Sequence, residues 1–332
     1  MKRILKALVC LMTLSLVVTG CAEEEINEQE VKNENVKKLQ VFDESSNERM
    51  VAVMINNNHS SWPHAGLQNA VLVYEIVVEG GITRELAVFK GNMPEKIGSV
   101  RSSRPYFIDY ALENDAIYVH WGGSKDAYSD LETLKVDRFD GMNGKYFYRD
   151  DSSGNAYEHT GFTKGSLIKE GIKANDMRDT TNSKMVFNYS VDEIDLSQME
   201  NSIDAKEIEI VYSSYHTTSY KYDEENKVYL RTLSGTDEVD AVTGKQYTVK
   251  NIITYQLNNS SYDDYGRQKL DNIGSGEGYY ITNGKATKIT WSKSSRSSKT
   301  VYKYKDSGEE ITLNDGNTYI QIQPKDKELV IK

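Results

Sequence analysis

Hydrophobic and polar positions define a first part of the chain, about 49–190, in which strand-like and helix-like segments alternate. Apolar, β-branched runs predict buried strands at 51–56, 71–78, 83–89 and 116–120. The segments 104–114 and 124–135 instead place apolar residues at helical spacing, and Ser124 is a good N-cap. Strands interleaved with helices indicate an α/β layer. The short break at 79–82 suits a hairpin, so we expect a mixed sheet.

The second part, about 205–332, shows the period-two alternation of short strands. These strands are predicted at 207–214, 217–223, 227–233, 247–257, 278–282, 286–292, 300–305 and 317–323. Asn283-Gly284 separates two of them and has the sequence of a tight hairpin turn. We interpret 191–204 as a linker or bridging helix. The expected fold class is α+β or α/β, with an N-terminal α/β domain containing a mixed sheet followed by a mainly antiparallel β C-terminal domain.

The N-terminus has the pattern of an export signal over residues 1–20. Cations are followed by an apolar run from 7 to 18, which is shorter than the roughly 20 residues that span a bilayer. Val18-Thr19-Gly20-Cys21 resembles the bacterial lipobox, so Cys21 is the expected lipidation site and membrane anchor. The alternative is an uncleaved anchor. The lipobox interpretation predicts a location on the outer face of the cytoplasmic membrane of a Gram-positive-type bacterium.

Charge and cysteine content narrow the function classes. The chain carries a net charge of −10, and residues 22–48 hold nine acids against three lysines. This polar stretch cannot bury enough apolar area to fold, so 21–48 is predicted to be a lipidated Cys followed by a flexible tether. An acidic body argues against nucleic-acid partners. The two cysteines, Cys10 and Cys21, both precede the body, which therefore has no disulfide and no thiol nucleophile.

Charged residues gather near the predicted strand ends of the first part, where α/β folds place ligands. Two arginines three residues apart, followed by a helix start, can hold a carboxylate or phosphate. A Gly-Gly-Ser turn before the second helix can offer backbone amides to the same anion. The alternative is that the arginines form structural ion pairs with Glu75, Glu79 or Asp109. The candidate ligand-binding residues are Glu75, Glu79, Arg84, Arg101, Arg104, Gly123 and Ser124.

The histidines offer candidates for acid–base chemistry. His120 ends a predicted strand and His159 follows Glu158, so each is a candidate general base, although each can instead satisfy backbone groups. His59 and His64 flank Trp62-Pro63 in a loop and are interpreted as surface residues, as is His216. The chain lacks the usual zinc-ligand spacings and nucleophile motifs, so no metal and no cofactor is predicted.

Several longer motifs resemble a known family. They are Pro63-His64-Ala65-Gly66-Leu67, VLVYEIVVEGGITRELAVF (71–89), IGSVRSSRPYFIDYA (97–111), YVHWGGS (118–124), VKNIITYQL (249–257), GSGEGYYITNGKATKITWSK (274–293) and LNDGNTYIQIQP (313–324). The chain thereby resembles the YerB-like bacterial lipoproteins, which carry the DUF3048 N-terminal and C-terminal domains. The resemblance implies shared positions at Glu79, Gly80, Gly81, Arg84, Arg101, Arg104, Gly123, Ser124 and His159. It implies no reaction.

Two function classes remain from the sequence. The first is a membrane-anchored, non-catalytic binding or accessory module in cell-envelope (peptidoglycan) synthesis or remodelling, with a wall enzyme or a peptidoglycan fragment as partner. The second is a hydrolase or transferase on a cell-wall polymer, with His120 or His159 as base and Arg101 and Arg104 as anion clamp. A solute-binding lipoprotein fits less well, because the two predicted halves differ in class.

Overall fold

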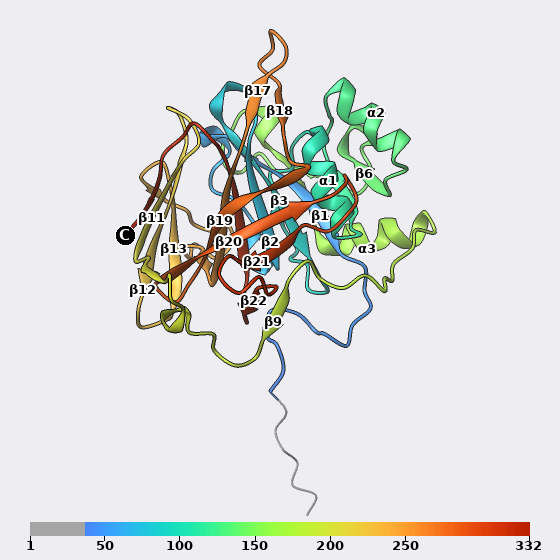
Figure 1. The fold of residues 1–332 in the computed structure, drawn as a ribbon. Coiled ribbons are helices and arrows are strands. Elements are labelled where there is room, and N and C mark those ends of the chain that lie inside the picture. The colour runs from blue at the N-terminus through green and yellow to red at the C-terminus, as the bar shows by residue number, and fades with distance from the viewer. Residues whose placement is uncertain (1–36) are drawn as a thin grey trace, which may run out of the picture. The chain divides into compact units, whose positions relative to one another are not determined.

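The computed structural model describes residues 37–332, which form one compact unit (Figure 1). The predicted signal peptide, Cys21 and most of the predicted tether lie outside the described residues. The last part of that tether, 37–48, packs on the body. Leu39 is buried, and the Asp315 carboxylate accepts hydrogen bonds from the backbone amides of Gln40 and Val41 at 2.8 and 3.0 Å. The tether prediction is therefore wrong for these residues, because an aspartate far along the chain satisfies their backbone.

An eleven-stranded mixed sheet forms the centre of the unit. Its strands, in spatial order, are β10 (Ile203–Asp204), β20 (Lys285–Lys293), β19 (Gly274–Thr282), β16 (Asn251–Leu257), β23 (Thr318–Pro324), β2 (Leu72–Val77), β3 (Thr83–Phe89), β1 (Val51–Asn57), β5 (Ile117–His120) and β6 (Arg138–Asp140), with β21 (Val301–Tyr304) beside β20. The strand β23 lies parallel to both β16 and β2. The two halves distinguished in the sequence therefore share one sheet.

A second, six-stranded sheet packs on one face of the first. It consists of β14 (Thr236–Asp237), β13 (Val228–Leu233), β12 (Thr217–Asp223), β11 (Glu207–Val211) and β24 (Leu329–Ile331), with β15 (Thr248–Val249) beside β13. Alternate residues of β1, β2 and β3, such as Val53 and Val73, join its Ile208 and Tyr220 in one core. The remaining small sheets pair β17 (Asn259–Ser261) with β18 (Gln268–Leu270), β22 (Thr312–Asn314) with β9 (Asn188–Ser190), and β4 (Ile97–Gly98) and β7 (Tyr148–Arg149) with β8 (Gly161–Thr163).

Two helices cover the opposite face of the large sheet. The helices α1 (Pro105–Glu113) and α2 (Lys125–Thr133) bury Phe107, Ile108 and Leu131 against Met54 and Ile76 in a second core. Figure 1 shows this layer and the six-stranded sheet on opposite sides of the large sheet. The third helix, α3 (Gly165–Ala174), packs near β6. Short 3-10 turns occur at η1 (His59–Ser61), η2 (Leu67–Asn69), η3 (Glu79–Gly81), η4 (Gly141–Asn143), η5 (Tyr157–His159) and η6 (Leu196–Gln198).

The result is a mixed α+β fold, as the sequence predicted at that level. The hairpin at Asn283-Gly284 is confirmed, since both residues have positive φ and join β19 to β20. The segment 191–204 holds only the turn η6 and the edge strand β10, so it is not a bridging helix. Its polar residues leave Leu196 as the buried apolar contact, which is too little to fix a helix face.

Candidate functional site

Four of the predicted residues meet beside the start of α1. Glu79 lies in the turn η3 that joins β2 to β3, Arg84 lies on β3, and Arg101 and Arg104 lie in the segment before α1. The Glu79 carboxylate accepts a hydrogen bond from Arg104 Nε and lies 3.6 Å from an Arg84 guanidinium nitrogen. We call Glu79, Arg84, Arg101 and Arg104 the arginine site. The pairing of Arg104 with Glu79 confirms the structural ion pair that the sequence offered as an alternative.

The remaining nitrogens of the arginine site bond mainly to backbone. Arg84 donates to the carbonyl oxygen of Ser102 at 2.7 Å, and Arg101 donates to that of Glu158 at 2.7 Å. The Arg84 side chain is nearly buried, yet its Nε has no hydrogen-bond partner within the described residues. A buried guanidinium N–H without an acceptor is costly.

The arginine site has more positive than negative charge. Burial, with a smaller contribution from the neighbouring Arg104, lowers the pKa of Arg84 to about 10 against the attraction of Glu79. Burial opposes ionisation of Glu79, but the hydrogen bond from Arg104 and the charge of Arg84 hold its pKa below the ordinary value. Glu79 lies against Arg84 and Arg104, and the Glu158 charge acts on Arg101, so two carboxylates face three guanidinium groups. The N-terminus of helix α1 adds partial positive charge at the same place. Its N-cap residue, Arg104, makes no side-chain capping bond to the first backbone N–H groups of the helix.

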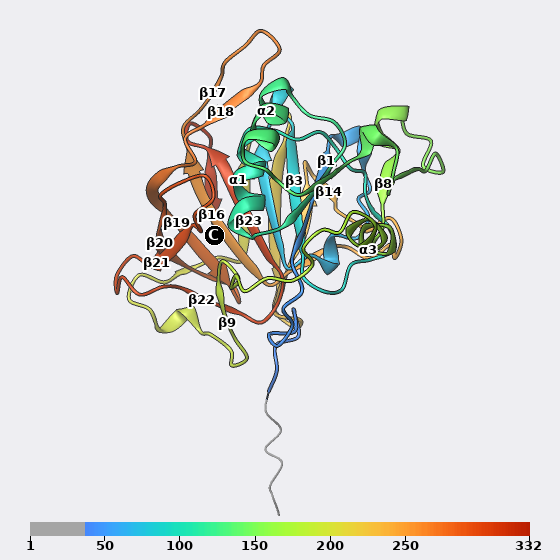
Figure 2. The same cartoon turned by 90° about the vertical axis from the view of Figure 1, so that its right-hand side faces the viewer.

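Aromatic side chains and a groove border the arginine site. The β17–β18 hairpin projects beside α1 and α2 (Figure 2), and Tyr262 in its loop donates to the Asp126 carboxylate at 2.6 Å. A groove of about 480 Å³ lies between this hairpin and α1, lined in part by Pro105, Tyr106 and Tyr262. On another side, the Arg149 guanidinium stacks on Trp121 and Tyr157, with ring centroids 4.3 and 3.8 Å away.

Gly123 and Ser124 have structural roles in this structure. Gly123 forms a β-bridge with Ser103, and Ser124 caps α2 by accepting a hydrogen bond from the Ala127 amide at 3.1 Å. This bond uses a lone pair of Ser124 Oγ and leaves its O–H group able to donate to a ligand. The Gly-Gly-Ser turn nevertheless lies next to the segment 101–104, because the backbone of Ser103 forms hydrogen bonds with that of Gly122 and Ser124.

The two candidate bases occupy different environments. His120 is fully buried, its Nδ1 bonds to the Gly122 carbonyl at 2.8 Å, and burial lowers its pKa despite the nearby Asp140. His159 lies near the arginine site, with Nδ1 2.8 Å from Asn56 Nδ2. Burial and the Arg101 charge lower the pKa of His159, so its imidazole is neutral at pH 7. Because the Asn56 amide nitrogen only donates, His159 Nδ1 accepts from it and the ring proton is on Nε2, whereas the buried His120 Nε2 has no partner within the described residues.

Glu75 is not part of the arginine site. It points to the other face of the large sheet, where it lies opposite Glu85 of β3 in the strand pairing. Arg231 of β13 crosses from the second sheet and donates to Glu75 at 2.6 Å, to Glu85 at 2.7 Å and to Glu238. Two histidines complete this interlayer charge cluster, which we define as Glu75, Glu85, Arg231, Glu238, His64 and His216.

The carboxyl groups of the cluster differ in the direction of their pKa shifts. Burial opposes the charge on Glu75, but Arg231 and a hydrogen bond with His216 lower its pKa. Burial likewise opposes the charge on Glu238, and Arg231 together with His64 lowers its pKa. Burial raises the pKa of Glu85 to about 7, because the attraction of Arg231 is offset by the neighbouring carboxylates. Glu85 is therefore the carboxyl group of the cluster that gains a proton most readily.

The sequence interpretation was wrong for two of these histidines. His64 and His216, expected at the surface, are both fully buried. His64 Nδ1 contacts Glu238 at 2.6 Å, and His216 Nε2 contacts Glu75 at 2.8 Å. Both partners lie more than a hundred residues away in the chain, which is why a local polar neighbourhood suggested exposure. The alternation of Tyr229, Arg231 and Leu233 in β13 was a usable signal, since it places Arg231 on the inward face.

The fold and the two polar groups define a layered α+β protein with an arginine site at one end of its central sheet. Models of the protein family of unknown function DUF3048 match it, the N-terminal domain over residues 38–178 and the C-terminal domain over 208–320. The chain belongs to this family.

One curated relative and one solved structure resemble the chain over most of its length. "Putative lipoprotein YerB" of Bacillus subtilis (strain 168) is 30% identical over 284 residues, which covers 83% of this chain and 81% of the relative. The crystal structure of the YerB protein from Bacillus subtilis superposes with a TM-score of 0.74 at 27% identity, covering 86% of this chain and 94% of that one. In residues 37–332, no helix is long and apolar enough to cross a membrane.

Proposed function

We propose that the protein is a lipid-anchored binding protein on the outer face of the cytoplasmic membrane of a Gram-positive-type bacterium. Two observations support the anchor. The Val18-Thr19-Gly20-Cys21 sequence matches a lipobox, and the relative from Bacillus subtilis carries the word lipoprotein in its name. Lipidation at Cys21 places the folded body, which starts within about 20 residues of it, close to the membrane surface.

The arginine site is the proposed ligand-binding site, and its ligand is an anionic group. The observation that carries this proposal is the excess of three guanidinium groups over the carboxylates of Glu79 and Glu158, with the buried Arg84 Nε left without an acceptor in the part of the chain that the structure describes. Arginine forks bind carboxylate and phosphate groups in two-point geometry. A bound anion would complete the hydrogen bonding of the site and balance its charge.

The proposed ligand class is a peptidoglycan fragment, bound by a carboxylate of its stem peptide. The aromatic residues around the arginine site support this class, because exposed rings such as Tyr157 suit stacking against sugar rings. The groove beside α1 offers space for the part of the ligand that carries no charge. The protein would then act as an accessory module in envelope synthesis or remodelling, presenting wall material to an enzyme.

A hydrolase or transferase acting on the same polymer is the second candidate. The observation behind it is a neutral His159 beside Arg101, and it requires Asn56 to release His159 Nδ1, to which it donates in this structure. In that case, His159 would take a proton from the attacking water or hydroxyl group, while the arginine site would hold the substrate carboxylate.

The test uses the full-length lipoprotein, extracted from membranes in mild detergent, and soluble muropeptides of defined stem peptide. Isothermal titration calorimetry should show binding that weakens with salt, because the contact is ionic. Arg101→Gln should weaken the affinity about tenfold or more, as expected for a lost charged hydrogen bond of about 1.5–3 kcal/mol. Arg138→Gln, which alters a partly exposed arginine paired with the exposed Glu132, is the matched control and should bind like the wild type.

Equal affinity of wild type and Arg101→Gln, or no binding of any muropeptide, would refute the proposed ligand site. Chromatography of the incubated muropeptides separates the two functions. An unchanged product profile supports the binding module, whereas cleavage or transfer that disappears in His159→Ala supports the enzyme.

A further inference from the structure

The interlayer charge cluster contains hydrogen-bond acceptors that face each other, and it is separate from the arginine site. His64 Nε2 lies 2.9 Å from the carbonyl oxygen of Asn56. A carbonyl only accepts, so the ring proton of a neutral His64 is on Nε2. The lone pair of Nδ1 then points at Glu238 Oε1, 2.6 Å away, which is also an acceptor. Two acceptors at this distance require a proton or a cation between them.

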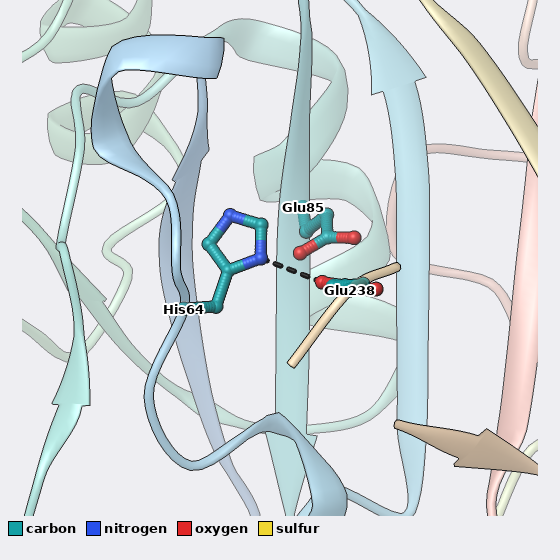
Figure 3. A group of neighbouring side chains, drawn as sticks. All are labelled: His64, Glu85 and Glu238. Atoms are coloured by element: carbon teal, nitrogen blue, oxygen red, sulfur yellow. Dashed lines mark hydrogen bonds and ion pairs between the residues drawn. The ribbon is translucent and has the colours of Figure 1, made fainter. Parts of the chain in front are cut away.

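Glu85 adds a third acceptor at the same place. Within the described residues its Oε2 has no hydrogen-bond partner, although the side chain is fully buried. One ligand atom from each of His64, Glu85 and Glu238 lies within 4.8 Å of the others. Figure 3 shows the Glu85 carboxylate turned toward the hydrogen bond between His64 and Glu238. The three side chains come from the loop after β1, from β3 and from the segment after β14.

The net charge of the cluster also favours a proton or a cation at this position. Glu75, Glu85 and Glu238 face a single guanidinium, Arg231, so the cluster carries two uncompensated negative charges when both histidines are neutral. Such an excess cannot remain in a fully buried site. It is balanced either by two protons or by one divalent cation.

Hydrogen bonds from neighbouring groups orient His64, Glu85 and Glu238, as outer hydrogen bonds orient the ligands of metal sites. Arg231 donates to Glu85 Oε1 and Glu238 Oε2, which leaves the other oxygen of each carboxylate for a ligand. The backbone carbonyl that accepts from His64 Nε2 fixes the tautomer whose Nδ1 can bind a metal. Carboxylate and imidazole ligands without cysteine suit divalent ions such as Zn²⁺ and Mn²⁺.

We propose that the interlayer charge cluster binds one divalent first-row transition ion, Zn²⁺ or Mn²⁺, through His64 Nδ1 and one oxygen each of Glu85 and Glu238. The ion replaces the two protons that otherwise balance the charge, one between His64 and Glu238 and one on Glu85, and both are released to solvent. Bonds of about 2.0–2.2 Å to the ion require the two atoms to separate beyond their metal-free contact. The ion then ties the first part of the chain, through β3 and the loop after β1, to the second sheet.

Because the three ligands are buried, the ion enters during folding. The first measurement is therefore the metal content of the full-length protein, extracted in detergent from cells grown with added Zn²⁺ and Mn²⁺. Mass spectrometry of the metals should find about one equivalent per chain. X-ray absorption should show coordination by nitrogen and oxygen, with no sulfur. Unfolding the protein in guanidinium with EDTA and refolding it with each ion separately should restore the equivalent and raise Tm by several degrees relative to refolding without metal.

Two variants and a control locate the ion. Glu85→Gln and His64→Gln should each reduce the metal to below about a tenth of an equivalent, since each removes one ligand. Glu75→Gln is the matched control, because Glu75 is equally buried and also bonds to Arg231 but lies outside the three ligands. It should keep the ion. Metal binding should also weaken as the pH falls, since protons compete for the same atoms.

The proposal is overturned if the folded wild type holds less than a tenth of an equivalent of either ion, both as extracted and after refolding. It is equally overturned if Glu85→Gln and His64→Gln retain the ion. Variants that do not fold leave the wild-type content and its absorption spectrum as the deciding measurements. None of these readouts depends on the ligand of the arginine site.

Discussion

Arg231→Met tests whether one guanidinium holds the two sheets together. Arg231 is fully buried and bonds to Glu75 at 2.6 Å, to Glu85 at 2.7 Å and to Glu238. Methionine fills much of the same volume but leaves three buried carboxylates without their cation. Breaking a buried ion pair from one side costs about 3–5 kcal/mol, so a loss of about 4 kcal/mol is expected. This is a large share of the roughly 5–15 kcal/mol that stabilises an ordinary folded protein.

Guanidinium unfolding followed by tyrosine and tryptophan fluorescence measures this loss, at pH 7 and with EDTA present so that metal content is equal. The control is Arg138→Met, whose arginine pairs with Glu132 at side-chain exposures of 25% and 73% and should cost less than about 1 kcal/mol. Adding Glu75→Gln to Arg231→Met should restore part of the lost stability, because one unpaired charge is removed. If Arg231→Met unfolds within 1 kcal/mol of the wild type, the cluster does not join the sheets as argued.

Three further predictions follow from burial, packing and the N-terminal pattern. Burial raises the pKa of Glu85 to about 7 in the folded protein, so the unfolded chain loses the Glu85 proton first as the pH rises. The free energy of unfolding should therefore fall by up to about 3 kcal/mol between pH 4.5 and pH 7. Urea unfolding of metal-free protein at pH 5 and pH 8 checks this, and a slope that persists in Glu85→Gln would assign it to another group. Gly141→Ala would place a methyl carbon 2.3 Å from Trp121, so the thermal midpoint should fall as expected for about 1–3 kcal/mol of overpacking; an unchanged midpoint contradicts this. Cys21→Ser should release the protein from the membrane fraction, and retention there in cell fractionation would disprove lipid anchoring.

Local patterns predicted much of the secondary structure. The apolar runs at 51–56 and 83–89 became β1 and β3, and helical spacing at 124–135 became α2 with Ser124 as its cap. The order of the strands could not be predicted in this way. The period-two pattern at 317–323 indicates a strand, but it does not say that the strand pairs with residues of the first half. Pairing across more than two hundred residues depends on the whole fold.

Only part of the candidate site could be predicted, because it too depends on contacts between distant segments of the chain. Glu79 and Arg104 are close in sequence, and their pairing was among the alternatives considered. Glu75 was grouped with them because it is near them in the chain, yet strand alternation turns its side chain to the opposite face, toward Arg231. Burial of His64 depends on Glu238 from the second sheet, a contact for which neither local sequence has a signal.

The position of β23 has a consequence for biogenesis. This strand ends eight residues before the C-terminus, yet it fills the gap between β16 and β2 in the central sheet. Synthesis from the N-terminus therefore leaves β2 without one neighbour until residues 318–324 have emerged, and its open edge needs protection from other strands. A chain cut short by about fifteen residues would lack this strand altogether. For this protein, a strand that lies far along the chain from β2 is the one that closes the central sheet.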